Sequence, residues 1–322
     1  MNLPAIRPSD PYVVVPATDD GIACAMVLGR RNPRPAKIWC VPPFSLASFF
    51  EFPAWHRVRA GAHLLIAGFN NTGSIREAIL RAPAAQITWW THHFWDEAGE
   101  REVASANVAL RRSPEFSSTC AWLLEELAID DPASREIACA IAIGRIPEPL
   151  LKPWFLVSLA VRSEPPQVER ALANWIVNAG PPDEEWRAQG EGVWESLSES
   201  YENANRWSFA AAREGRASVL PIPRSMVAHF PVLAEIAWAR GGDHWIVLLV
   251  DREDHLILRL NPRLRAEPLR AARLVDEALG DRATRLFDRL TLLVETERLG
   301  PIGTVEALAK NAHLLDFAAT DC

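Results

Sequence analysis

Short apolar runs alternate with amphipathic stretches along the first half of the chain. The runs are too short for helices and rich in β-branched or aromatic residues, which predicts strands at Tyr12–Pro16, Lys37–Val41, His63–Phe69 and Gln86–Trp90. Helical spacing of apolar residues predicts helices at Ser74–Ala82 (with Ser74 as a cap), Ser117–Leu127 and Pro132–Ile143. Nearly continuous apolar strands separated by helices predict an α/β domain, a parallel sheet with helices on both faces.

The pattern changes after Ile146, where proline-rich punctuation separates helical segments. A second, smaller α/β unit follows, and its predicted elements are strands at Ala217–Pro223, Trp245–Val250 and Leu256–Leu260, the last two as a hairpin, and helices at Val227–Arg240, Glu267–Leu279 and Thr304–Phe317. We therefore expect a first domain over residues 1–146, a helical proline-rich linker region over 147–215, and a second domain over 216–322.

Composition and charge argue against several classes of protein. The chain has 322 residues, a formal net charge of −7 and 49% hydrophobic residues, which is typical of a globular protein. The negative charge disfavours a cationic surface, so we expect little binding to duplex DNA. No apolar run is long enough to cross a membrane and no signal core is present. Five scattered cysteines, Cys24, Cys40, Cys120, Cys139 and Cys322, lack metal-type spacing, and a cytoplasmic location is expected.

Polar residues follow three of the predicted strands: Thr18–Gly21, Gly68–Gly73 and Thr91–Asp96. Ligands of parallel sheets bind outside the carboxyl ends of the strands, so these residues are expected to meet at one site. Taken alone, His92 and His93 are most simply explained as rings that satisfy strand-end backbone groups or stack among neighbouring aromatics. Asp20, before Gly21, is compatible with two roles, a cap for the following helix or a metal ligand.

Three segments resemble the motifs of the DHH phosphoesterases. "VVVPATDDGIACAMVL" is similar to the family's opening motif, in which a strand ends in a His-x-Asp-x-Asp-Gly pattern. "WWTHHFWDE" resembles the Asp-His-His motif, and "SPEFSSTCAWLLEEL" is similar to the serine-rich helix start that follows it. The resemblance implies a DHH domain followed by a smaller DHHA1-like domain.

The resemblance also implies a site for two Mn²⁺ or Mg²⁺ ions, which anionic carboxylates hold against their mutual repulsion. Carried over residue by residue, the pattern keeps Asp20, His92 and His93 as potential metal ligands. The other expected aspartates fall at neutral or basic residues: Thr18, Gly68 (or Ala67 with a shift of one), Thr91, and Gly144 or Arg145. The family's late Gly-Gly-Gly-His signature has no counterpart. The sequence therefore predicts a degenerate metal site with no cofactor.

Three functions remain open, the last of them a purely structural partner whose cleft is closed by the tryptophans. The first is a catalytically inactive DHH-type protein that binds a nucleotide, a single-stranded nucleic-acid end or a protein partner. The alternative is an active Mn²⁺- or Mg²⁺-dependent phosphodiesterase on short oligonucleotides or cyclic dinucleotides, with a metal ion held by Asp20, His92 and His93. The missing carboxylates favour the first.

Overall fold

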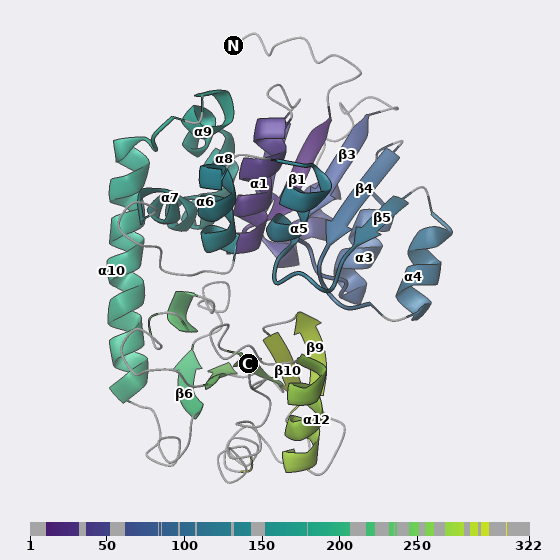
Figure 1. The fold of residues 1–322 in the computed structure, drawn as a ribbon, viewed down its shortest axis with the longest axis vertical. Helices are drawn as coiled ribbons and strands as arrows, with labels where there is room; N and C mark the ends of the chain where they lie inside the picture. The colour runs from purple at the N-terminus through teal and green to yellow at the C-terminus, as the bar shows by residue number, and fades with distance from the viewer. Residues whose placement is uncertain are drawn as a thin grey trace. The chain divides into compact units, whose positions relative to one another are not determined.

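The computed structural model describes residues 11–31, 37–51, 62–82, 84, 86–95, 97–106, 108–129, 132–142, 152–178, 180–206, 217–222, 232–234, 236, 245–250, 255–260, 268–279, 284–288, 291–295 and 307. The chain divides into two compact units, Met1–Trp194 and Glu195–Cys322. The boundary falls within a long helix, α10, Glu184–Arg206 (Figure 1). The division into regions 1–146, 147–215 and 216–322 stays a prediction.

The first unit is built on a parallel sheet. Among the described residues it has five strands in the order β2-β1-β3-β4-β5. Their bounds are β1 Tyr12–Pro16, β2 Lys37–Val41, β3 His63–Ala67, β4 Gln86–Thr91 and β5 Val108–Arg112. All the pairings are parallel, so every strand ends at the same edge of the sheet. The fold is α/β, as the sequence predicts.

Alternate residues of strands β1 to β4 enter two different hydrophobic cores. On one face Val13, Val15 and Trp90 pack with α1, α5, α6 and α7. On the other face Val14 and Trp89 pack with α2 and α3. The helices on the two faces are α1 Asp19–Arg31, α2 Leu46–Glu51, α3 Gly73–Leu80, α4 Glu97–Ala104, α5 Thr119–Glu126, α6 Pro132–Ala142 and α7 Lys152–Ser163. Because both faces are covered there, strands β1 to β4 are mostly apolar.

The two edges of this sheet differ. At β2, the backbone N–H of Ile38 donates to Glu169 Oε1 at 2.7 Å, and the short helix α8, Val168–Ala171, packs beside the strand. A side chain thus satisfies a group that an open edge would leave unpaired. At the opposite edge β5 ends in two exposed arginines, Arg111 and Arg112. Charged side chains on an edge strand oppose pairing with other chains.

Several predicted boundaries shift, and some elements have no counterpart in the prediction. The third strand ends at Ala67 and not at Phe69. The cap of α3 is Thr72, without a side-chain hydrogen bond, so the prediction of Ser74 as the cap is wrong. Helices α2 and α4 and strand β5 were not predicted, because their short segments lack a clear apolar period.

Helices α7 to α10 follow the sheet within residues 152–206, and the part up to Trp194 belongs to the first unit. Two short helices, η3 Pro165–Gln167 and α9 Ala173–Asn178, lie between α7 and α10. Gly190 of α10 lies so close to α7 that an added Cβ would be 1.9 Å from the carbonyl oxygen of Leu156. In the part of the chain that the structure describes, no helix is long and apolar enough to cross a membrane.

The second unit contains a mixed sheet with the described strand order β6-β7-β8-β10-β9. Its elements are β6 Ala217–Ile222, β7 Trp245–Val250, β8 His255–Arg259, α12 Pro268–Leu279, β9 Thr284–Asp288 and β10 Thr291–Glu295. Strands β6 and β7 are parallel and the other pairs antiparallel, and β7 and β8 are adjacent antiparallel strands, as predicted. The predicted helix Thr304–Phe317 lies outside the described residues, apart from residue 307.

Candidate functional site

The predicted site residues lie at the carboxyl edge of the first sheet. Asp20 stands two residues into α1, just after β1, whereas Gly68 follows β3 and Thr91 ends β4. The chain leaves β1 toward the face of α1 and leaves β3 toward the opposite face, that of α3. The strand order therefore reverses between β1 and β3, which is where open α/β sheets bind their ligands.

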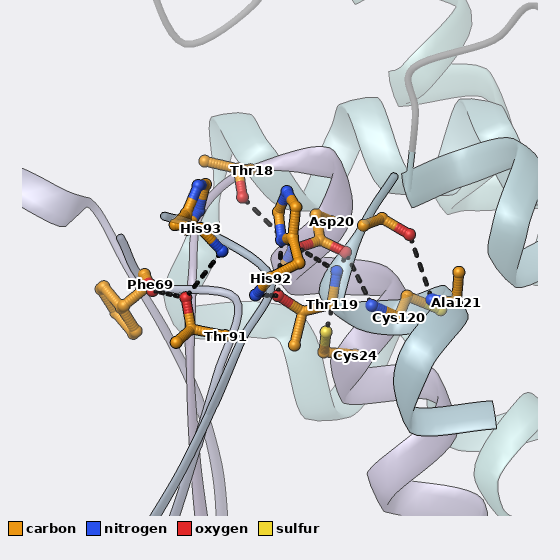
Figure 2. A network of polar contacts seen from close by, with 12 residues as sticks. Thr18, Asp20, Cys24, Phe69, Thr91, His92, His93, Thr119, Cys120 and Ala121 are labelled. Carbon is orange, nitrogen blue, oxygen red and sulfur yellow. Dashed lines mark hydrogen bonds and ion pairs between the residues drawn. The ribbon is translucent and has the colours of Figure 1, made fainter. Parts of the chain in front are cut away.

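Asp20 binds the N-terminus of α5, far away in the sequence. Its Oδ2 accepts from the backbone N–H of Thr119 at 3.1 Å and its Oδ1 from that of Cys120 at 2.9 Å (Figure 2). The next N–H of the helix, that of Ala121, donates to the cap residue Ser118. A carboxylate at this position satisfies two backbone donors that have no partner within the helix and also complements the helix dipole.

His92 lies beside the same carboxylate. Its Nδ1 is 2.8 Å from Thr119 Oγ1 and 3.5 Å from Asp20 Oδ2, and the His92 backbone N–H also donates to Thr119 Oγ1. The side chains of Thr119 and Asp20 thus both lie at Nδ1 of the His92 ring. A proton relay through imidazole needs a partner at each nitrogen, so Asp20, His92 and Thr119 do not form a catalytic triad.

Thr91 and His93 complete the end of β4. The Thr91 hydroxyl donates to the carbonyl oxygen of Phe69 at 3.0 Å and accepts from the backbone N–H of His93 at 3.3 Å. The rings of His92 and His93 lie 4.1 Å apart between centroids. Thr91, His92 and His93 are all buried. The Thr91 side chain therefore joins the ends of β3 and β4 as a neutral hydrogen-bonding group.

Two glycines let α1 and the end of β3 approach each other. Gly68 has φ +83°, in the left-handed region that favours glycine, and an added Cβ would be 3.3 Å from Gly21 Cα. At Gly21 a Cβ would be 2.0 Å from the carbonyl oxygen of Pro16. The backbone geometry consequently disfavours any side chain at position 68, including a carboxylate.

Thiols lie beneath Asp20 where α1, α5 and α6 meet. Cys24 Sγ is 3.9 Å from Asp20 Oδ1, and Cys24 and Cys120 are fully buried. Burial raises the pKa of both thiols well above the ordinary value, and the charge of Asp20 raises it further. Thiols with a raised pKa are poor nucleophiles, and these two serve as small apolar residues.

The residue next to Asp20 forms a buried ion pair. Arg162 of α7 donates through Nη1 to Asp19 Oδ1, and the two side chains are 1% and 2% exposed. The Arg162 guanidinium also partly offsets the effect of burial that raises the pKa of Cys40 to about 12. The first turn of α1 therefore contacts α7 through Asp19 and α5 through Asp20.

The structure brings together most residues that the sequence singles out. Thr18 accepts from the backbone N–H of Gly21, and Asp20, Thr91, His92 and His93 lie around the same strand ends (Figure 2). Gly68 lies close to Gly21 at the same edge. Arg145 and Gly144 lie outside the described residues. The contacts made by Thr119 and by Arg162 were not predicted. The serine-rich helix start is a sequence signal for the contacts of Thr119, whereas no sequence pattern indicates those of Arg162.

Known structures share this architecture, although no protein-family model and no curated protein matches the sequence. The structure is similar, with a TM-score of 0.54 and 12% identity, to a DHH-domain protein described as a member of the s1p family of ribosomal proteins. That match covers 95% of this chain and 87% of the other. The chain has the fold of the DHH family.

Other matches to DHH-fold proteins are more distant. RecJ of Thermus thermophilus, solved with Mn²⁺, has a TM-score of 0.46 and 14% identity over 94% of this chain. The match covers 52% of RecJ, so this chain spans about half of that protein. An exopolyphosphatase-related protein of Bacteroides fragilis has a TM-score of 0.45 and 10% identity, with 97% of this chain and 94% of the other covered.

The donor atoms at the edge do not fit the pair of Mn²⁺ or Mg²⁺ ions that the DHH resemblance implies. In the described ranges, no group of three or more His, Cys, Asp or Glu side chains is arranged to hold a metal ion. Asp20 is bound by α5, and Asp19 is paired with Arg162. Hard dications a few ångströms apart need several anionic oxygens to offset their charge, and these residues do not supply them.

Proposed function

We propose that this chain is a DHH-fold protein that does not hydrolyse phosphoesters and acts as a binding subunit. Its ligand would be a nucleotide, a single-stranded nucleic-acid end or a protein partner. The observation that carries this proposal is the pair of hydrogen bonds from Thr119 and Cys120 to Asp20. They commit both oxygens of the carboxylate to the start of a helix, so a metal ion would have to compete with two backbone donors.

Two further features support the loss of hydrolysis. The hydroxyl of Thr91 is neutral and already bonds the strand end, whereas a carboxylate there would carry charge for a metal ion. Gly68 has no side chain and sits in a conformation that favours glycine. The strand ends retain a position that suits ligand binding, without the charges of a two-metal centre.

One observation favours the alternative, an active metal-dependent phosphodiesterase. Asp20 Oδ2 and His92 Nδ1 are 3.5 Å apart, and the centroid of the His93 ring lies 4.1 Å from that of His92. A carboxylate and two imidazoles could hold a single transition-metal ion. This arrangement would use Asp20 both as a helix cap and as a ligand, and it would lack the second metal ion.

A pair of assays on the full chain separates these functions. Hydrolysis of a dinucleotide, a cyclic dinucleotide and a generic phosphodiester is measured with Mn²⁺ or Mg²⁺, and the expected result is no turnover above the protein-free rate. Binding of a fluorescent 5′-phosphorylated oligonucleotide or nucleotide is measured with EDTA present, where binding is expected to persist. Turnover that disappears in both Asp20→Ala and His92→Ala would establish the enzyme instead.

A further inference from the structure

The buried ion pair between Asp19 and Arg162 joins α1 to α7 across 143 residues of sequence. Both side chains are almost completely removed from water. A buried charge is tolerated when an opposite charge and hydrogen bonds compensate it, so each of these residues depends on the other. The pair thus fixes where the first turn of α1 lies against α7.

Asp19 and Asp20 are consecutive and contact different helices. Successive residues of an α-helix point about 100° apart, so the orientation of one turn determines where both side chains reach. Asp19 meets the Arg162 side chain of α7, whereas Asp20 meets the backbone N–H groups at the start of α5. A rotation of this turn that moved Asp19 would therefore also move Asp20.

The backbone near this turn is closely packed against the ends of β1 and β3. An added Cβ at Gly21 would be 2.0 Å from the carbonyl oxygen of Pro16, so the turn cannot move toward β1. On the side of α7, Asp19 of this turn meets the side chain of Arg162.

We infer that Arg162 is a positioning residue for Asp20. By holding Asp19 it orients the first turn of α1, so that the Asp20 carboxylate meets the N–H groups of Thr119 and Cys120 and the ring of His92. This inference goes beyond the proposed function. It concerns a metal-free contact, so it stands or fails independently of whether the chain hydrolyses phosphoesters.

Native-state amide hydrogen exchange on the full chain, with EDTA present, tests the inference. In Arg162→Met the amides of Thr119 and Cys120 are expected to exchange at least about 10-fold faster, because their acceptor moves away. The Leu127 amide at the far end of α5 and the Glu164 amide at the end of α7 are the references, since both donate to helix carbonyls. Their rates are expected to rise less.

The matched control is Arg170→Met, because Arg170 forms an exposed ion pair with Glu185 near α7. It is expected to leave the Thr119 and Cys120 rates unchanged. Arg162→Lys, which keeps the charge, is expected to restore part of the protection. If Arg162→Met does not fold, Asp19→Asn is measured with the same expectation. A uniform rise at all amides, or unchanged Thr119 and Cys120 rates, would show that the pair is only structural and overturn the inference.

Discussion

Asp20 Oδ1 accepts a hydrogen bond from the backbone N–H of Cys120 at 2.9 Å, across 100 residues of sequence. This contact gives the carboxylate at the strand ends a role that needs no metal ion. It holds the start of α5 against the start of α1, and α5 in turn packs in the core on that face of the sheet. The junction is therefore a structural contact whose removal should change stability.

Replacing Asp20 by alanine is expected to destabilise the first unit by about 3–6 kcal/mol. Two backbone donors would lose a charged acceptor, and each such hydrogen bond contributes about 1.5–3 kcal/mol. Urea unfolding followed by tryptophan fluorescence measures the difference. Asp20→Asn, which keeps one acceptor oxygen, is expected to lose about half as much.

Asp183→Ala is the control for this prediction. Asp183 accepts from the backbone N–H of Glu185 at the start of α10 but is exposed, so its loss is expected to cost about 1 kcal/mol or less. An equal effect of the two alanine variants would mean that Asp20 is an ordinary helix cap.

Two glycines of α10 are expected to respond to alanine in opposite directions. At Gly190 the added methyl group would be 1.9 Å from the Leu156 carbonyl oxygen, which forces α7 and α10 apart. At Gly192 no heavy atom lies within 4 Å of the added group. Gly190→Ala should therefore lower the free energy of unfolding by about 1–3 kcal/mol, the usual cost of overpacking. Gly192→Ala should raise the free energy of unfolding by about 1 kcal/mol, because alanine has the higher helix propensity.

Thermal unfolding of the two variants and of the parent chain tests whether Gly190→Ala lowers and Gly192→Ala raises the stability. A Gly190→Ala variant as stable as the parent would show that α7 and α10 do not approach so closely.

The sheet and its central strands follow from the sequence because buried parallel strands are short, apolar and β-branched. Tyr12–Pro16, inside the sheet, is predicted at its observed bounds for that reason, and so is Lys37–Val41, an edge strand that is mostly apolar. Strand β5 is not, since its arginines lie at an exposed edge and interrupt the apolar pattern. Exposed strands such as β5 and short helices depend on tertiary contacts more than on local periodicity.

The candidate site was predictable in its location and less so in its contacts. The strands of a parallel sheet end at the same edge, and Asp20, Gly68 and His92 each follow a predicted strand. The sequence alone therefore predicts that these three residues lie at one edge of the sheet. The sequence left open whether Asp20 caps a helix, and it suggested the helix that follows Asp20 in the chain. In the structure the carboxylate binds the start of α5, a contact that depends on how two distant helices pack.

Stability is expected to fall as the pH drops below about 6.5 through the effect of His63. Burial lowers the pKa of His63 from its ordinary value of 6.5, and its Nε2 lies 2.8 Å from Thr88 Oγ1. The unfolded chain then binds a proton at higher pH than the folded chain. The contribution of neutral His63 to stability is therefore complete above pH 6.5 and is lost as the pH falls toward the pKa of the folded state.

Urea unfolding between pH 7.5 and 5 compares the parent chain with His63→Gln, which cannot titrate. The free energy of unfolding of the parent is expected to fall more steeply with decreasing pH. Identical slopes would show that His63 titrates alike in both states.

The central claim, that the strand ends do not form a two-metal centre, is tested most directly by calorimetric titration of the full chain with Mn²⁺. We expect no submicromolar binding of two ions per chain, because Asp20 is bound by α5 and neutral Thr91 and Gly68 occupy the neighbouring strand ends. Submicromolar binding of two ions per chain, accompanied by phosphodiester turnover that is lost in Asp20→Ala and His92→Ala, would contradict the account.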